Sequence, residues 1–312
     1  MGSNSQRSAV NSPYPSQFSI SELEGFSGVK AHTIRVWERR YNLLDPDRTG
    51  SNYRLYSMDE LRTILNVAFL VGQGMKIGKV AAMSPAERAA KIQELSTNKA
   101  GVGEVLNQLK LAMLTFDEAL FRSASEQHRR LEGFNALVEG VYVPLLEHIG
   151  HLWHSGAICP SQEHFVSNLI RQRIVAETDA LPLAPNAAGL YVLYLPDQEI
   201  HELGLLYTNY LLRSLGNRTI YLGQSVPNED LQQVSDLFDG PITFISFITT
   251  SPTAEGMQRY MDSLRAMVAS PKCTFWFSGS QVNRAPQLKL PEGFRTFPHI
   301  RDLIGAFSSA QA

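Results

Sequence analysis

The spacing of hydrophobic residues over the first 80 positions predicts short helices joined by turns. Residues 1–16 are rich in Ser, Asn, Pro and Gln and predict a mobile tail, with order beginning near Phe18. Helices are expected at residues 21–25, 31–41 and 58–72. Gly28 separates the first two, and the alternation around Tyr53 and Leu55 predicts a short hairpin arm. Two helices across a turn followed by a hairpin predict a winged helix-turn-helix.

The following hundred residues carry only helical periodicity. A helix followed by a linker is expected over residues 84–99. Further helices are expected near residues 102–114, 117–130, 135–154 and 161–178. Four helices with short connections predict a four-helix bundle. Pro144 lies inside the third of them and is expected to kink or divide it.

Beyond a linker at residues 181–188 that holds two prolines, strand and helix patterns alternate. Strands are expected at residues 189–195, 218–222, 242–248, 273–278 and 295–298, and helices at 202–215, 228–238, 253–269 and 300–309. This alternation predicts a parallel α/β sheet with helices on both faces. Ligands of such sheets bind at the carboxyl ends of the strands.

The predicted fold class is therefore multidomain, with three folded domains of different architecture. We expect a tail over residues 1–16, a winged helix-turn-helix over 17–84, a linker over 85–100, a helical bundle over 101–181 and an α/β domain over 188–312. The α/β domain should have a flavodoxin-like, that is Rossmann-like, parallel sheet.

The composition is that of a globular protein and excludes several classes. Hydrophobic residues make up 44% of the 312 positions and charged residues 19%, which excludes a disordered or fibrous chain. No apolar run reaches the roughly 18 residues of a membrane helix, so no membrane partner is expected. Cys159 and Cys273 are too few for a disulfide framework, and a cytoplasmic location is expected.

Positive charge gathers in the winged helix-turn-helix. Residues 29–79 hold nine basic and five acidic residues, a local charge of +4, whereas the whole chain carries −2. A solvated helix face would also suit these charges. However, the second helix of a helix-turn-helix enters the major groove, and here it carries Arg35 and Arg39. Double-stranded DNA is therefore the expected partner of this domain.

Three segments of this domain resemble the MerR family of winged-helix regulators, namely Ile20–Leu23, Thr33–Tyr41 and Asn52–Ser57. The resemblance implies that the protein binds operator DNA as a homo-oligomer. It places Thr33, Arg35 and Arg39 on the recognition helix, and Arg54 and Tyr56 at wing contacts to phosphate. For Trp37 and Tyr53 we expect mainly a packing role.

Five of the eight histidines fall between positions 148 and 201. Imidazole is the commonest metal ligand, but a zinc site needs three or four ligands of suitable geometry. His148, His151 and His154 share a helix face only loosely, so we expect His148 and His151 to be ordinary core or surface residues.

His201 differs because it follows the first strand of the α/β domain, where a ligand is expected. It lies in Glu199-Ile200-His201-Glu202-Leu203-Gly204. This E-x-H-x-x-G element resembles the cobalamin-binding motif of methionine synthase and the mutases, usually D-x-H-x-x-G. The resemblance implies that His201 is an axial cobalt ligand and that Glu199 holds its other ring nitrogen. Gly204 would let the helix start approach the corrin edge.

Later residues continue this motif. Between Gly204 and Ser246 lie 41 residues, the family's spacing, and Ser246-Phe247-Ile248 matches its S-x-L/V element. The resemblance implies that Ser246 hydrogen-bonds the displaced benzimidazole. The family then has two glycines, but here Gly279 follows a serine. Ser278 is expected to crowd the nucleotide tail.

The bundle carries a second signal. Trp153 is followed by nine residues and then by Glu163-His164. This W-x9-E-H element resembles the cap of CarH/LitR-type B12-dependent photoreceptors. The resemblance implies that Trp153 packs over the adenosyl group of adenosylcobalamin, with Glu163 and His164 hydrogen-bonding near it. His154 would become a second cobalt ligand after photolysis.

The resemblances together imply a light-responsive transcriptional regulator with adenosylcobalamin as chromophore and no enzymatic activity. Family members form DNA-binding tetramers in the dark, which dissociate when light breaks the cobalt–carbon bond. Two alternatives stay open: a regulator that senses cobalamin without light, or one with another chromophore such as a bilin. A cobalamin enzyme is a distant alternative, since the chain has no room for a substrate barrel of about 250 residues.

Overall fold

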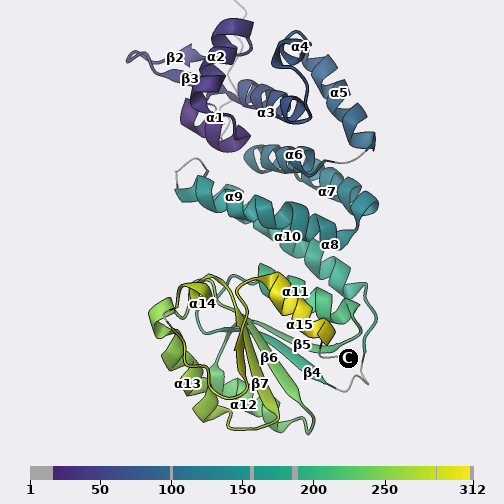
Figure 1. The fold of residues 1–312 in the computed structure, drawn as a ribbon, viewed down its shortest axis with the longest axis vertical. Coiled ribbons are helices and arrows are strands. Elements are labelled where there is room, and N and C mark those ends of the chain that lie inside the picture. The colour runs from purple at the N-terminus through teal and green to yellow at the C-terminus, as the bar shows by residue number, and fades with distance from the viewer. Residues whose placement is uncertain (1–16, 99–100, 155–157, 185–188, 286, 310–312) are drawn as a thin grey trace, which may run out of the picture. The chain divides into compact units, whose positions relative to one another are not determined.

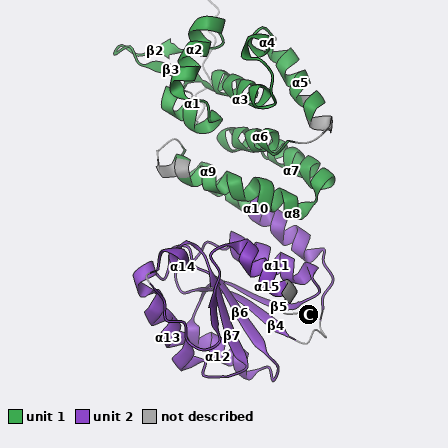
Figure 2. Ribbon diagram, viewed as in Figure 1, with its two compact units in different colours: residues 1–168 green, residues 169–312 purple. Residues whose placement is uncertain are grey.

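The computed structural model describes residues 17–98, 101–154, 158–184, 189–285 and 287–309. The tail expected at residues 1–16 lies outside these residues. The chain divides into two compact units, Met1–Asn168 and Leu169–Ala312 (Figure 2). The finer division into winged helix, linker, bundle and α/β domain stays a prediction. None of the described helices is long and apolar enough to cross a membrane.

Unit 1 begins with the expected winged helix-turn-helix (Figure 1). Its elements are β1 (Gln17–Phe18), α1 (Ile20–Ser27), α2 (Ala31–Tyr41), β2 (Asp47–Arg48), β3 (Arg54–Ser57) and α3 (Met58–Gly72). Ser19 and Glu22 form a capping box that starts α1. Gly28 ends it with φ 73°, a left-handed conformation that favours glycine. β3 lies between β1 and β2, and both neighbours are antiparallel to it.

Two helices follow the winged helix before the bundle. They are α4 (Ile77–Ala81) and α5 (Pro85–Asn98). The sequence predicted α5 but not α4, a helix of one turn whose periodicity is too short to detect. α5 packs against α3.

The bundle contains α6 (Val102–Thr115), α7 (Glu118–Glu132), α8 (Phe134–Leu137), α9 (Val143–His154) and α10 (Pro160–Asp179). A π-helical turn, Val138–Tyr142, lies between α8 and α9. Pro144 follows directly and has no N–H to donate to an i−4 carbonyl. The Val143 N–H instead bonds the Val138 carbonyl, five residues back. The sequence predicted a kink or a division of this helix, and the structure has a π turn just before Pro144.

Unit 2 contains a parallel sheet of five strands in the order β5-β4-β6-β7-β8. The strands are β4 (Leu190–Pro196), β5 (Arg218–Val226), β6 (Ile242–Phe247), β7 (Cys273–Ser278) and β8 (Phe294–Thr296). The order is the flavodoxin-like one, and every pairing is parallel. The expected fold class is confirmed.

Helices cover both faces of this sheet (Figure 1). They are α11 (Leu203–Ser214), α12 (Asn228–Asp236), α13 (Met257–Met267), α14 (Ser280–Arg284) and α15 (Ile300–Ser309). Leu190, Val192 and Tyr194 of β4 belong to the core beneath α12 and α13. Tyr191 and Leu193 belong to the core beneath α11 and α15. Both faces of β4 are buried, so this strand is a rigid support for the loop that follows its carboxyl end.

Candidate functional site

Glu199 ties together two loops at the carboxyl end of the sheet. The carboxylate is fully buried in the loop between β4 and α11. Oε1 accepts the N–H groups of Ile200 and His201, each at 3.0 Å. Oε2 accepts those of Thr249, Thr250 and Ser251, in the loop after β6, at 2.6–3.1 Å. One side chain therefore satisfies five backbone donors.

These donors also fix the charge of Glu199. Burial alone would raise the pKa of this carboxyl. The N–H groups of Thr250, His201 and Ser251, together with the His201 side chain, outweigh burial and lower the pKa to about 2. Glu199 is consequently a carboxylate at neutral pH.

His201 is held at one ring nitrogen and exposed at the other end of its ring. Its Nδ1 lies 2.7 Å from Glu199 Oε1, and the side chain is 50% exposed. A carboxylate at Nδ1 fixes the tautomer with the proton on Nδ1 and leaves Nε2 as a free acceptor. This is how a carboxylate orients a metal-ligating histidine. The arrangement fits the axial-ligand role that the sequence predicts for His201.

The other motif residues lie around the same edge of the sheet. Ser246, at the end of β6, is completely buried, and its Oγ has no hydrogen-bond partner within the described residues. A buried hydroxyl without a partner is costly, and the nitrogen of a bound benzimidazole would satisfy it. A Cβ at Gly204 would lie 3.0 Å from the Phe247 ring, so the helix start is already closely packed.

Gly279 is required where β7 ends. Its φ is 113°, and a Cβ there would lie 2.4 Å from the Ile248 carbonyl oxygen. Ser278, which replaces the family's other glycine, is buried and donates its hydroxyl to the Phe297 carbonyl at 2.9 Å. Its side chain is thus engaged by the loop after β8. The expected crowding of a nucleotide tail by Ser278 stays a prediction.

Glu202 is a site residue that sequence reasoning missed. It is buried beside His201. Its Oε1 accepts the Arg171 Nε–H at 2.5 Å, and its Oε2 accepts the Tyr221 hydroxyl at 2.8 Å. The hydrogen bond and charge of Glu202 raise the pKa of Arg171. Arg171 lies on α10, so this ion pair attaches the second half of α10 to the His201 loop. The sequence signal for this role was that Glu199–Gly204 contains a second acidic residue, Glu202.

The predicted cap residues are only partly described. The side chains of Trp153 and His154 lie outside the described residues, although α9 extends to His154. Glu163 and His164 lie in the first turn of α10, with His164 Nδ1 2.8 Å from Glu163 Oε2. His164 is 71% exposed, and Glu163 also accepts the Ser167 hydroxyl. The Glu163 and His164 side chains therefore lie side by side at the start of α10.

No cluster of three His, Cys, Asp or Glu side chains that could hold a metal ion occurs within the described part of the chain. A corrinoid needs no such cluster, because its macrocycle supplies the equatorial nitrogens and the protein supplies one axial ligand. The imidazole of His201 could supply such a ligand.

The recognition helix presents the predicted basic residues to solvent. Arg35 and Arg39 of α2 are exposed, and neither has an ion-pair partner within residues 17–98. Thr33 is partly exposed, and its Oγ1 lies 3.3 Å from His32 Nε2. Ile34 and Trp37 form the buried face of the helix, as expected for Trp37.

The wing differs from expectation at its tyrosines. Tyr56 is fully buried and donates its hydroxyl to Glu38 Oε2 at 3.1 Å. Burial and the Glu38 charge raise the pKa of Tyr56. A phosphate contact by Tyr56 is therefore wrong for this structure, because the middle strand β3 turns its ring into the core. Tyr53, expected to pack, is instead 72% exposed.

Arg54 is the other predicted wing contact. Its Nε lies 3.0 Å from Glu38 Oε1, and the side chain keeps 29% of its surface exposed. The ion pair with Glu38 joins the wing to α2. Arg54 can therefore reach a phosphate only with the part of its guanidinium that Glu38 leaves open.

Known proteins match both halves of this arrangement. The family model for MerR HTH family regulatory proteins matches residues 18–87, and one for a B12 binding domain matches residues 105–176. The second match falls on the helical bundle. The Methanosarcina barkeri monomethylamine corrinoid protein shares the fold at 14% identity, with a TM-score of 0.55 over 67% of this chain and 100% of that one.

Two repressors of Myxococcus xanthus match most of the chain. The HTH-type transcriptional repressor CarH is 33% identical over 69% of this chain and 73% of its own length. The repressor CarA is 28% identical over 81% of this chain and 84% of its own length. The two family models together match the winged helix-turn-helix and the helical bundle. The chain belongs to the CarH-type family of MerR transcription regulators that carry a B12-binding domain.

Proposed function

We propose that this B12-binding transcription regulator responds to light, with adenosylcobalamin as its chromophore. The observation that carries the proposal is the Glu199–His201 pair, which leaves one imidazole nitrogen free at the carboxyl end of the sheet. When bound, adenosylcobalamin supplies a cobalt–carbon bond that visible light can break. In this proposal the chain acts as a switch and not as an enzyme, in keeping with its repressor relatives.

Each predicted residue has a role in the proposal. His201 and Glu199 hold the lower face of the cofactor, Ser246 bonds its nucleotide tail, and Gly204 and Gly279 keep the backbone close. Trp153 roofs the upper face, and Glu163 and His164 hydrogen-bond near the adenosyl group. His154 would be a second imidazole ligand for the cobalt in the illuminated protein. A shift of the helical bundle then causes the tetramer present in the dark to dissociate in light. Dissociation in turn changes binding to the operator.

The test uses the full chain loaded with adenosylcobalamin in the dark. Green light should change the absorption spectrum, the gel-filtration volume and the affinity for operator DNA together. A spectrum that changes while the elution volume and DNA affinity do not would reject light regulation. DNA affinity that depends on cobalamin but not on light would identify a sensor of the vitamin itself. Bilin absorption bands in the purified protein would identify another chromophore.

We further propose that Thr33, Arg35 and Arg39 of α2 read the operator, with Arg54 and the exposed Tyr53 on its flank. Arg39→Ala should weaken operator binding about 10- to 100-fold, because a lost base or phosphate contact costs about 1–3 kcal/mol. The dissociation constant, measured at several salt concentrations, checks this. If Arg39 contacts phosphate, the salt slope should also fall by about 1.

Arg40→Ala is the matched control for Arg39→Ala. Arg40 is the next residue of the same helix and equally basic, but its guanidinium lies over the Tyr41 ring, 5.5 Å from the centroid. Replacing Arg40 by alanine should change the affinity for operator DNA little. Equal losses in the two variants would mean that only net charge matters and would contradict a specific role for Arg39.

A further inference from the structure

We propose that the helical bundle holds the DNA-reading domain directly, through α1, and that Lys110 of α6 is the positioning residue of this contact. The inference rests on the proposed function in one respect only: a ligand-driven change in the bundle is what the contact would transmit.

The end of α1 depends on Lys110. The last carbonyls of a helix have no partner within the helix. Lys110 Nζ donates to the carbonyl of Phe26, in the last turn of α1, at 2.9 Å. A cation there also matches the negative end of the helix dipole. Lys110 is partly buried, and burial lowers its pKa to about 8.

A second bundle helix reaches α1 beside this bond. A Cβ at Gly25 would lie only 3.2 Å from Leu152 Cδ2 of α9. Leu152 is buried. The glycine thus allows α9 to approach the α1 backbone closely. Leu152 also immediately precedes Trp153, the proposed roof over the upper face of the cofactor.

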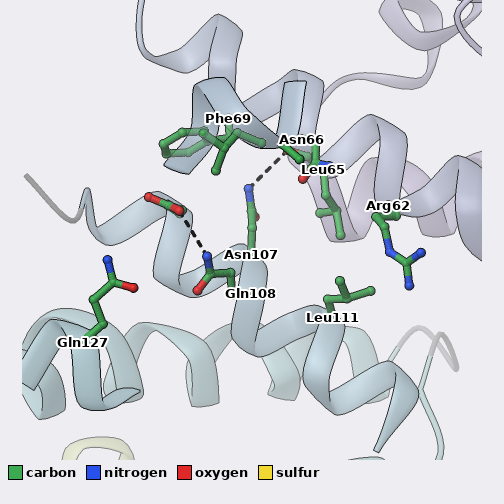
Figure 3. A pocket seen from close by; sticks show the side chains of 11 residues that line it. Arg62, Leu65, Asn66, Phe69, Asn107, Gln108, Leu111 and Gln127 are labelled. Atoms are coloured by element: carbon green, nitrogen blue, oxygen red, sulfur yellow. Dashed lines mark hydrogen bonds between the residues drawn. The ribbon is translucent and has the colours of Figure 1, made fainter. Parts of the chain in front are cut away.

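α6 also packs against α3. Asn107, one turn before Lys110, donates its Nδ2 to the Leu65 carbonyl at 3.3 Å (Figure 3). Beside this bond lies a cavity of about 400 Å³ between α3, α5, α6 and α7. Figure 3 shows the Gln108 and Gln127 amides and the Phe69 ring around it. Close packing transmits a displacement, whereas a cavity absorbs it. A displacement can therefore pass to α1 through Lys110 and Leu152, which contact it directly.

The position of α1 also determines that of the recognition helix. α1 packs against both α2 and α3, and Leu23 and Phe26 on α1 are fully buried, as is Ile34 on α2. A shift of α9 or α6 against α1 would consequently move α2, which carries Arg35 and Arg39. We infer that the bundle controls DNA reading by moving α1.

The first test is Lys110→Met, which keeps the length and apolar stem of the side chain but removes the ammonium. Hydrogen exchange of the cobalamin-free full chain should show α1 amides exchanging about tenfold faster, as expected when a buried bond to a charged group is lost. Amides of β4 and β6 in unit 2 should exchange as in the wild type. Lys289→Met removes an exposed lysine from unit 2 and is the charge-matched control.

The second variant is Gly25→Ala. Alanine favours the helix itself, so the α1 helix should form at least as well, yet the added carbon must push Leu152 away. In the wild type, adenosylcobalamin is expected to change the DNA dissociation constant by some factor. In both variants this factor should be at most half as large, and the cobalamin absorption spectrum should be unchanged. The DNA probe is a duplex selected by the wild-type protein from a random-sequence pool.

The readouts separate this inference from the proposed function. If wild-type DNA affinity does not depend on adenosylcobalamin, the proposed regulation fails, and hydrogen exchange alone decides the contact. Wild-type protection of α1 in Lys110→Met would then overturn the inference, whereas faster exchange would support it. If the DNA affinity of the wild type does depend on adenosylcobalamin, the inference is overturned when both variants show the same dependence as the wild type.

Discussion

Replacing His201 by alanine is expected to abolish tight retention of cobalamin. The Glu199 carboxylate holds Nδ1 of His201 at 2.7 Å, so Nε2 is the ring nitrogen that would bind the cobalt of a cobalamin. Loss of that ligand should weaken binding by about 100-fold or more, beyond the 10- to 100-fold typical of residues that only orient a ligand. Absorbance of the cobalamin that coelutes with the protein on gel filtration measures the effect.

The matched control is His299→Ala, which removes an exposed histidine from another loop of the same unit. That variant should retain cobalamin fully. Free imidazole should partly restore binding to His201→Ala, because the cavity left by the ring can admit it. Undiminished coelution in His201→Ala would contradict the axial-ligand role, whatever the behaviour of the control.

The location of this site was predictable because parallel strands end at one edge of a sheet. The alternating pattern after residue 189 indicated the strands, and the rule for ligand position then placed Glu199, Ser246 and Gly279 at a common edge. The structure brings the loops that follow β4 and β6 within hydrogen-bond distance of each other through Glu199. Chain order and strand direction predicted the common edge but not the bonds between Glu199 and the loop after β6.

The tyrosines of the wing were not predictable from alternation alone. A period of two assigns Tyr53 and Tyr56 to opposite faces but does not say which face is buried. β3 became the central strand because β1 pairs with it, with Phe18 opposite Tyr56. That pairing joins residues far apart in sequence and buries Tyr56, whereas Tyr53 lies just before β3 and is exposed.

The Arg171–Glu202 pair was missed for a related reason. The two residues lie 31 positions apart, and α10 reads from its sequence as an ordinary bundle helix. Only the fold shows that its second half belongs to the unit of the α/β sheet. α10 thus carries Glu163 and His164 at its start and, two turns later, the arginine that bonds the residue after His201.

The glutamate at position 199 departs from the aspartate that is usual in related motifs. Its longer arm spans two loops: Oε2 reaches the N–H groups of Thr249, Thr250 and Ser251, while Oε1 keeps His201. Glu199 therefore anchors the loop after β6 and the imidazole at the same time. The stability of the site should consequently depend on this one carboxylate.

Glu199→Gln is accordingly expected to destabilise unit 2. The pKa of Glu199 falls from 4.5 to about 2 on folding, and each pKa unit corresponds to about 1.4 kcal/mol, so the carboxylate contributes about 3 kcal/mol at pH 7. Because the folded pKa is the lower one, this contribution is present above pH 4.5 and is lost as the pH falls toward 2. Denaturant unfolding, with hydrogen exchange of β4 and β6 reporting on unit 2, measures it.

The difference in unfolding free energy between wild type and Glu199→Gln should therefore be constant from pH 7 to pH 5 and shrink below it. Asp197→Asn makes the same chemical change two residues earlier, on an exposed side chain, and should cost less than about 0.5 kcal/mol. A difference that did not change between pH 5 and pH 3 would mean that Glu199 is bound through its shape and not its charge. His201 would then lack the carboxylate that directs its free nitrogen toward cobalt.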